Sequence, residues 1–342
     1  MSTSEALADA TIALAALLAD RAGAGRVRAL SRLAGGRNNR VYRVETETGV
    51  PLLLKRYFSD PRDGRDRLAA EWRFLQRAWR NGIRSIPQPL AMDADEDAAL
   101  YSFVPGRKLC ASELDARHVD AAANFILAIN AHRPAGIDPA SDACLSISDH
   151  LQLVEHRLLR LAALDPLAPC ASEAQRLVFM TLRPSWDAVR DRTMREAFAL
   201  GLDLHRPLTE AECCLSPSDF GLHNALLGDD EELVFLDFEY AGRDDPAKLV
   251  VDFFCQPEVP VPPQHRDRFM ARLAGAMLLD EAALARCNIL LDACRVKWAC
   301  ILLNDFLSVG AARRAFAATS EREARCAAQL DKAKAKLAEI RG

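Results

Sequence analysis

The segment Leu215–Phe238, LSPSDFGLHNALLGDDEELVFLDF, contains two short apolar runs separated by four consecutive acidic residues. The runs, 224–228 and 233–238, predict a β-hairpin whose turn consists of the acidic residues 229–232. A four-residue turn pairs residue 228 with 233, and counting back along the antiparallel ladder pairs 224 with 237. We therefore expect Asn224 and Asp237 to face each other, with their backbones about 5 Å apart.

An amide oxygen opposite a carboxylate predicts a site for a hard cation. Mg²⁺ takes oxygen ligands of this kind and usually fills its remaining positions with water and phosphate oxygens. Asp219 lies five residues before Asn224, at the end of the segment that leads into the hairpin, close enough to act as a base beside the metal. The pattern favours phosphoryl transfer.

The spacing Asp219-x4-Asn224, followed by Asp237-Phe238-Glu239, resembles the catalytic and metal loops of the aminoglycoside phosphotransferase and choline kinase-like family, relatives of the protein kinases. The resemblance implies that Asp219 orients the acceptor hydroxyl and takes its proton, while Asn224 and Asp237 hold magnesium. It also implies an α+β, two-lobed protein-kinase-like fold with an N-terminal antiparallel sheet plus helix and a larger, mainly helical C-terminal lobe.

One position departs from the family pattern. The family usually has a His two residues before the base, and this chain has Pro217 there, flanked by Ser216 and Ser218. The serines are candidates to supply replacement hydrogen bonds. A catalytically weak pseudokinase, acting as a nucleotide-binding regulatory module, stays open as an alternative to the enzyme.

A second alignment with kinase motifs fails. Asp219-Phe220-Gly221 spells the protein-kinase metal motif and His205-Arg206 the start of a kinase catalytic loop, but Pro207 occupies the position of the base. Proline neither accepts a proton nor binds a metal, and no Asn follows at the required spacing. A protein kinase is also disfavoured because no long activation loop follows Asp237.

The N-terminal third predicts a strand, a glycine turn and a second strand. The turn, 34–39, contains Gly35, Gly36 and Asn38, and glycine backbones can approach phosphate oxygens closely with their N–H groups directed at the anion. The stretch GGRNNRVYRV resembles the family's nucleotide-covering loop. These residues are therefore expected to contact the phosphates of ATP or GTP.

A buried ion pair is predicted between the next strand and helix. Lys55 follows three leucines in the strand 50–57, so its ammonium is expected to be partly buried and to need a partner. The helix predicted over about 63–80 has an apolar face with helical spacing, and Glu71 lies on that face. We expect Lys55 to pair with Glu71 and to point at the nucleotide phosphates. The alternative is that Glu71 lies at the edge of the face in water.

The run 98–104 and Pro105-Gly106 resemble the family's hinge between lobes. The resemblance implies that the carbonyl of Ser102 and the N–H of Val104 meet the adenine edge. The acidic stretch 93–97 reads as a solvated hairpin tip because it lacks the glycine and closing glutamate of a calcium loop.

Helical spacing dominates after Gly106. We expect an N-terminal helix over 1–25, a nucleotide-binding lobe over 26–104 and a catalytic and acceptor-binding lobe over 105–342. Helices are predicted over 115–131, 147–164, 173–182 and, after a break at Pro184, 185–200; others resume near 263, and Asp245-Pro246 suits a helix start.

Composition narrows the function and the compartment. The net charge of −4 gives no support for nucleic-acid binding, and no apolar run reaches the roughly 18 residues of a membrane span. The first apolar stretch follows acidic residues, which argues against a signal peptide. The ten cysteines contain no C-x-x-C pair, so we expect reduced core thiols in a cytoplasmic protein.

The acceptor is expected to be a small molecule with a hydroxyl group: a sugar, amino sugar, cyclitol or amino alcohol. The candidate wall of its site is the segment 292–306, which carries Lys297, Trp298 and Asp305, although an ordinary buried helix would look the same. His223 is expected to be structural, because strand alternation would point it away from Asn224. Asp252 is read as a structural acid.

Overall fold

The computed structural model describes residues 3–33, 39–59, 63–131, 136–276, 278–308 and 322–341. The chain divides into two compact units. The first contains the chain up to Arg107 and the returning segment Leu226–Tyr240, and the second contains Lys108–Ala225 and most of the chain from Ala241 onward. The glycine turn with Gly35, Gly36 and Asn38 lies outside the described residues.

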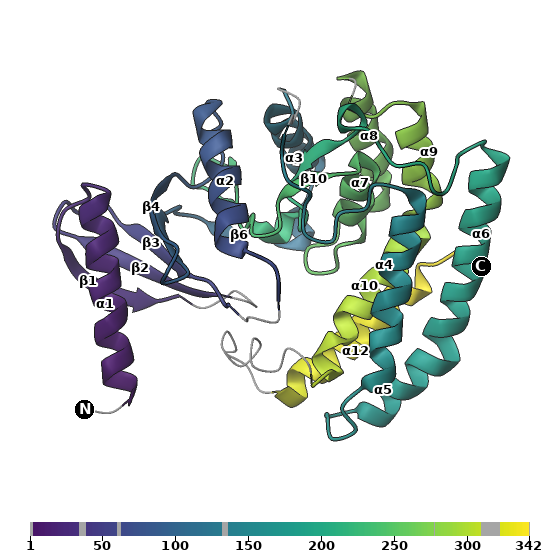
Figure 1. Cartoon of the computed structure of the whole chain (residues 1–342), viewed down its shortest axis with the longest axis horizontal. Helices are drawn as coiled ribbons and strands as arrows, with labels where there is room; N and C mark the ends of the chain where they lie inside the picture. Colours follow the sequence, from purple (N-terminus) through teal and green to yellow (C-terminus); the bar gives the residue numbers. More distant parts are fainter. Residues whose placement is uncertain are drawn as a thin grey trace. The chain divides into compact units, whose positions relative to one another are not determined.

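The first unit is built on a five-stranded antiparallel sheet with the order β1-β2-β3-β5-β4 (Figure 1). Its strands are β1 (Val27–Arg32), β2 (Arg40–Thr46), β3 (Leu52–Arg56), β4 (Pro89–Asp93) and β5 (Ala98–Ser102). Helix α1 (Thr3–Arg21) contacts β1, β4 and β5, and its Leu14 and Leu18 belong to the same buried apolar cluster as Leu52 and Leu54 of β3. Because side chains alternate along a strand, Lys55 projects to the opposite face of the sheet.

Helix α2 (Arg67–Arg80) contacts β4 and β5. It begins later than the predicted residue 63 because the carboxylate of Asp66 caps it, accepting a hydrogen bond from the N–H of Ala69. Leu68, Glu71 and Leu75 are buried on one side, so the acidic residue lies on the apolar face as expected.

The hairpin of the motif segment is formed by β8 (Ala225–Leu227) and β9 (Leu233–Phe235), in a sheet with the order β6-β8-β9, where β6 is Arg107–Lys108. The predicted four-residue turn is wrong. Gly228 N–H donates to Glu232 O, Glu231 N–H donates to Gly228 O, and Glu231 has φ 62°, so the loop has three residues and ends in a left-handed bulge. The ladder is therefore one residue away from the predicted pairing.

Asn224 and Asp237 also lie outside the two strands. Asn224 ends the 3₁₀ turn η5 (Leu222–Asn224), and Asp237 has φ 65°, in the left-handed region. Strand pairing consequently does not determine where either side chain points.

The second unit is mainly helical. It contains α3 (Ala116–Ile129), α4 (Ile147–Arg160), α5 (Ala171–Leu177), α6 (Arg183–Ala199), α7 (Pro246–Cys255), α8 (Arg266–Gly275), α9 (Glu281–Ile289), α10 (Leu291–Leu302) and α12 (Arg322–Ala338). Helix α10 packs against α4, α6 and α12 and is central to an apolar core of the second unit (Figure 1). The strands β7 (Cys214–Ser216) and β10 (Gly242–Asp244) pair antiparallel. An antiparallel sheet in the first unit and a mostly helical remainder confirm the predicted fold class.

Pro184 does not interrupt the helix, contrary to the prediction. Helices α5 and α6 are joined by the π-helical segment Val178–Leu182, and Pro184 occupies the first turn of α6. Proline lacks the N–H that an α-helix would use here, and its ring crowds the carbonyl four residues earlier. The wider π turn directly before it accommodates both defects.

Helix α7 begins as predicted at Asp245-Pro246. The carboxylate of Asp245 accepts a hydrogen bond from Ala247 N–H, and all ten residues of the helix are buried. None of the described helices combines the length and the hydropathy needed to cross a bilayer.

Candidate active site

In the first unit, the ammonium of Lys55 lies between two carboxylates. Its Nζ donates to Glu71 Oε2 and to Asp237 Oδ1, both at 2.6 Å. The Lys55–Glu71 pair is the one predicted from the sequence, and Glu71 is buried instead of lying in water. The bond to Asp237 brings the predicted nucleotide-binding lysine together with a predicted metal ligand.

Glu71 is fixed by more than Lys55. Its Oε2 also accepts a hydrogen bond from the hydroxyl of Tyr57 at 2.6 Å, and its Oε1 accepts one from the backbone N–H of Phe238 at 3.2 Å. The rings of Phe74, one turn along α2, and Phe238 stack with centroids 4.3 Å apart. Helix α2 therefore holds the backbone of the Asp237 loop as well as the lysine.

Glu239 is a member of this cluster that the sequence reasoning did not select. Its Oε2 accepts a hydrogen bond of 2.6 Å from Nδ2 of Asn39, and both residues are buried. Oδ1 of Asn39 also accepts a hydrogen bond from the backbone N–H of Phe58 at 3.4 Å. The available signal was an acidic residue within the apolar sequence FLDFEYAG, since a buried carboxylate needs a partner.

Three carboxylates surround the ammonium of Lys55. Burial alone would lower the pKa of Lys55, but the carboxylates of Asp237, Glu71 and Glu239 raise it well above its ordinary value, so the ammonium stays charged. Burial, followed by repulsion from Asp237, raises the pKa of Glu239. The Asp237 side chain is 36% exposed and so is accessible to a cation from solvent.

A protein cage for that cation is not complete. Within the ranges that the structure describes, no three His, Cys, Asp or Glu side chains are grouped as metal ligands. The donor set fits a hard cation that is bound by one or two protein oxygens and completed by phosphate oxygens.

Ser102, the predicted hinge residue, is fixed at the end of β5. Its N–H donates to Gln88 O at 3.0 Å, and its hydroxyl accepts from Gln88 N–H at 2.8 Å. Val104 follows two residues later in the same unit, where the backbone is irregular.

In the second unit, the loop that carries Asp219 is stabilised by serines. Oγ of Ser216 accepts a hydrogen bond from Ser218 N–H at 3.0 Å, and Oγ of Ser218 donates to Ser141 O at 3.4 Å. Asp219 N–H donates to Pro217 O at 3.0 Å. The replacement hydrogen bonds expected around Pro217 are present.

Asn224 is held against the same loop. Its Nδ2 donates to the backbone carbonyl of Asp219 at 3.0 Å, which leaves the amide oxygen as the atom type that a hard cation binds. Asp219 and Asn224 thus form one local group in the second unit, and Lys55, Glu71 and Asp237 form another in the first.

Strand alternation does not place His223, because residues 222–224 form a 3₁₀ turn, in which successive side chains do not alternate between two faces. The Nε2 atom of His223 lies 3.5 Å from Oδ1 of Asp219.

The predicted acceptor wall divides into two parts. Lys297 and Trp298 both donate to Oδ1 of Asp252, Trp298 through Nε1 at 3.2 Å, whereas Asp305 pairs with Arg325 at 3.3 Å. Asp252, expected to be structural, therefore fixes two of the three candidate residues.

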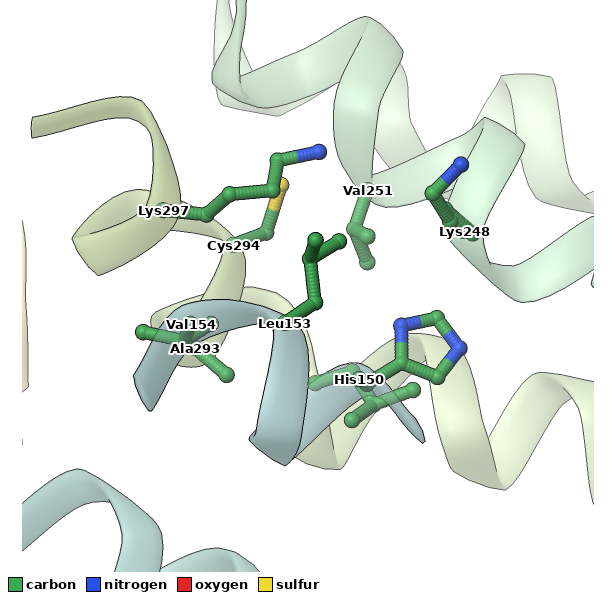
Figure 2. Close-up of a pocket in the computed structure, with 9 residues that line it drawn as sticks. His150, Leu153, Val154, Lys248, Val251, Ala293, Cys294 and Lys297 are labelled. Carbon is green, nitrogen blue, oxygen red and sulfur yellow. The ribbon is translucent and has the colours of Figure 1, made fainter. Parts of the chain in front are cut away.

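Lys297 lines a cavity formed by three helices of the second unit. Figure 2 shows Lys297 and Cys294 of α10, Lys248 and Val251 of α7, and His150 of α4 around it. Among the residues that the structure describes, the polar side chains on its wall are Lys or His with one Cys thiol, and none is a carboxylate. The carboxylates of Asp244 and Asp252 bind the two lysines, yet neither lines the cavity.

Comparison with known proteins agrees with this fold. The choline kinase LicA from Streptococcus pneumoniae superposes with a TM-score of 0.59 at 14% identity, covering 95% of this chain and 98% of that one. Spectinomycin phosphotransferase APH(9)-Ia gives a TM-score of 0.58 at 14% identity, with coverages of 94% and 96%. A putative fructosamine-3-kinase from Thermobifida fusca gives 0.54 at 18% identity, with coverages of 94% and 98%. At these identities the likeness establishes a protein-kinase-like fold.

The sequence itself decides the family. Residues 29–254 match the model of the phosphotransferase enzyme family, APH, and the chain belongs to that family. The match includes the Lys55 cluster and the Asp219 loop, so the predicted resemblance to aminoglycoside phosphotransferases and choline kinases is confirmed. The protein is an enzyme of the small-molecule kinase and phosphotransferase class. A comparison with curated protein sequences finds no match.

Proposed function

We propose that this enzyme transfers the γ-phosphoryl group of ATP or GTP to a hydroxyl group of a small molecule. The observation that supports this most strongly is the buried Lys55 ammonium held between Glu71 and Asp237. A lysine fixed by a helix carboxylate, beside a second acid with an exposed edge, suits the binding of a nucleotide polyphosphate with a divalent cation.

In this proposal, Lys55 neutralises charge on the nucleotide phosphates and Glu71 keeps it aimed. Asn224 and Asp237 would hold Mg²⁺, which when bound supplies positive charge to the β- and γ-phosphate oxygens. The exposure of the Asp237 carboxylate beside Lys55 supports Mg²⁺ binding. Gly35, Gly36 and Asn38 would cover the phosphates, and the carbonyl of Ser102 and N–H of Val104 would meet the base.

Asp219 is proposed to orient the acceptor and to take its proton. The hydroxyl oxygen attacks the γ-phosphorus, the bond from that phosphorus to the β–γ bridging oxygen breaks, the nucleoside diphosphate leaves, and the hydroxyl proton passes to Asp219. The serine hydrogen bonds that hold this loop despite Pro217 support an active enzyme over a pseudokinase.

The cavity in Figure 2 has a volume of about 10 Å³, which is room for about one water molecule, so it supports no choice among acceptors. The acceptor is proposed as a small molecule with a hydroxyl group: a sugar, amino sugar, cyclitol or amino alcohol. Reduced cysteines throughout the chain support a cytoplasmic location.

The test is nucleoside diphosphate release from Mg·ATP or Mg·GTP with glucose, glucosamine, myo-inositol, choline or ethanolamine as acceptor. We expect phosphorylation of at least one member of this panel, and Asp219→Asn should lower kcat by about 10²–10⁴-fold while the nucleotide Kd stays within about twofold. Unchanged turnover in Asp219→Asn would refute the assignment of the base. Magnesium-dependent nucleotide binding without turnover on any hydroxyl compound would favour the regulatory module.

A further inference from the structure

We propose that His223 is a positioning residue that holds the carboxylate of Asp219 through Nε2, an inference that rests on the proposed function. In this loop, the side chain of His223 approaches the carboxylate of Asp219, the proposed base. The Nε2 atom of His223 lies 3.5 Å from Oδ1 of Asp219, a separation at which a small closure of the loop makes a hydrogen bond. The His223 side chain is 16% exposed and that of Asp219 is 37% exposed, so the ring supports the acid from the protein side.

The two ring nitrogens of His223 have different surroundings, and Nε2 is the one that faces Asp219. Among the residues that the structure describes, none forms a hydrogen bond with the buried Nδ1 of His223. A carboxylate accepts only, so a hydrogen bond from the ring to Asp219 requires an N–H on Nε2.

The backbone around the ring is shaped to admit it. A Cβ atom placed on Gly221 would lie 2.6 Å from Nδ1 and 3.0 Å from Cε1 of His223, so only glycine allows the ring to fold back over the loop. Phe220, between Asp219 and this glycine, stacks on Phe125 at 5.9 Å and on Phe253 at 5.2 Å. The loop is anchored on one side by aromatic packing and on the other by the imidazole.

The location of His223 in the sequence follows from the same geometry. The imidazole is four residues after the base and one before Asn224, on a 3₁₀ turn that also orients the Asn224 amide onto the carbonyl of Asp219. Consecutive residues thus hold the two ends of one aspartate: Asn224 its backbone and His223 its carboxylate. Loss of the imidazole would leave Asp219 in place but free to rotate about its side-chain bonds.

Two conservative substitutions separate the two ring nitrogens. The amide nitrogen of glutamine reaches the position of Nε2, whereas that of asparagine reaches only the position of Nδ1. We expect His223→Gln to retain kcat within about threefold. His223→Asn should lose about 10–100-fold in kcat, the range for misplacing a reacting group by about 1 Å, with KM for nucleotide unchanged.

The decisive measurement combines both variants with Asp219→Asn, assayed by ADP release from Mg·ATP with the best acceptor of the panel above. If His223 acts through the carboxylate, His223→Asn adds less than about twofold to the loss already caused by Asp219→Asn. Equal kcat in His223→Gln and His223→Asn, or a full additional loss in the Asp219→Asn background, would overturn the proposal. Circular dichroism and thermal midpoints of each variant establish that the fold is intact.

The outcomes distinguish this inference from the proposed function. Wild-type turnover in Asp219→Asn would remove the base and with it both proposals. An inactive Asp219→Asn variant together with identical Gln and Asn variants at residue 223 would remove only the role of His223.

Discussion

The substitution Glu71→Gln tests the Lys55 cluster most directly, because it changes one oxygen to an amide nitrogen without altering the shape of the side chain. Glu71 accepts hydrogen bonds from Lys55 Nζ, Tyr57 Oη and Phe238 N–H. Glutamine has one acceptor oxygen, so its NH₂ group must face one of these donors. Both the negative charge and at least one hydrogen bond are lost.

The expected cost is about 2–4 kcal/mol in the free energy of unfolding. Removing one partner of a buried ion pair costs about 3–5 kcal/mol, because the other charge is left uncompensated. Here the cost is reduced, since Lys55 keeps its 2.6 Å bond to Asp237. The destabilisation should belong to the first unit, which contains all of these residues.

Urea unfolding followed by tryptophan fluorescence suits this measurement, because Trp72 and Trp79 lie on the same helix as Glu71. Tyr57→Phe is the graded control: it removes a single hydroxyl that bonds Glu71 and Tyr101, and about 1 kcal/mol is expected. The KM for nucleotide should rise in Glu71→Gln, because Lys55 is no longer aimed. A change in stability below about 0.5 kcal/mol would refute the reasoning, since a buried carboxylate that binds three donors cannot be neutral to its own removal.

Two further predictions concern the second unit. His150 Nε2 lies 3.2 Å from Asp245, and although burial lowers its pKa, Cys144 and Asp245 raise it to about 10. The protonated ring therefore contributes stability that is complete below pH 6.5 and is lost as the pH rises from 6.5 toward 10, by about 5 kcal/mol. Thermal midpoints between pH 6 and 10 should fall more for the wild type than for His150→Gln, and parallel curves would contradict the assignment. A Cβ on Gly242 would lie 2.5 Å from Ala140 N, so Gly242→Ala should cost about 1–3 kcal/mol in chemical unfolding, whereas Gly275→Ala, with open space at its Cβ, should be neutral or stabilising. Equal effects at the two glycines would show that the close approach at Gly242 does not matter.

Local patterns in the sequence were sufficient for the Lys55–Glu71 pair. Strand alternation places Lys55 on the face of β3 opposite Leu52 and Leu54, which belong to the same apolar cluster as α1. The helical spacing of α2 places Glu71 among apolar side chains. Each pattern depends only on the period of its own element, 2 for a strand and 3.6 for a helix. The pair follows because two buried groups of opposite charge on adjacent elements stabilise each other.

The hairpin shows where such patterns fail. The acidic residues 229–232 indicate a turn, but a loop one residue shorter than predicted changes the partner of every residue in the ladder. The left-handed conformation of Glu231 makes this choice, and glutamate has no special preference for that conformation. The residue types in the turn therefore do not determine whether Asn224 pairs with Asp237.

The sequence by itself determined the antiparallel sheet with its buried lysine, the helical remainder, the helix start at Asp245 and the family. These features follow from periodicity, from capping chemistry and from the order of Asp219, Asn224 and Asp237 along the chain. Only the tertiary structure revealed Glu239 bound to Asn39 and His223 beside Asp219. The physical reason is that both contacts depend on backbone turns and on partners brought together by folding, and neither turn geometry nor distance in space has a period that can be read along a chain.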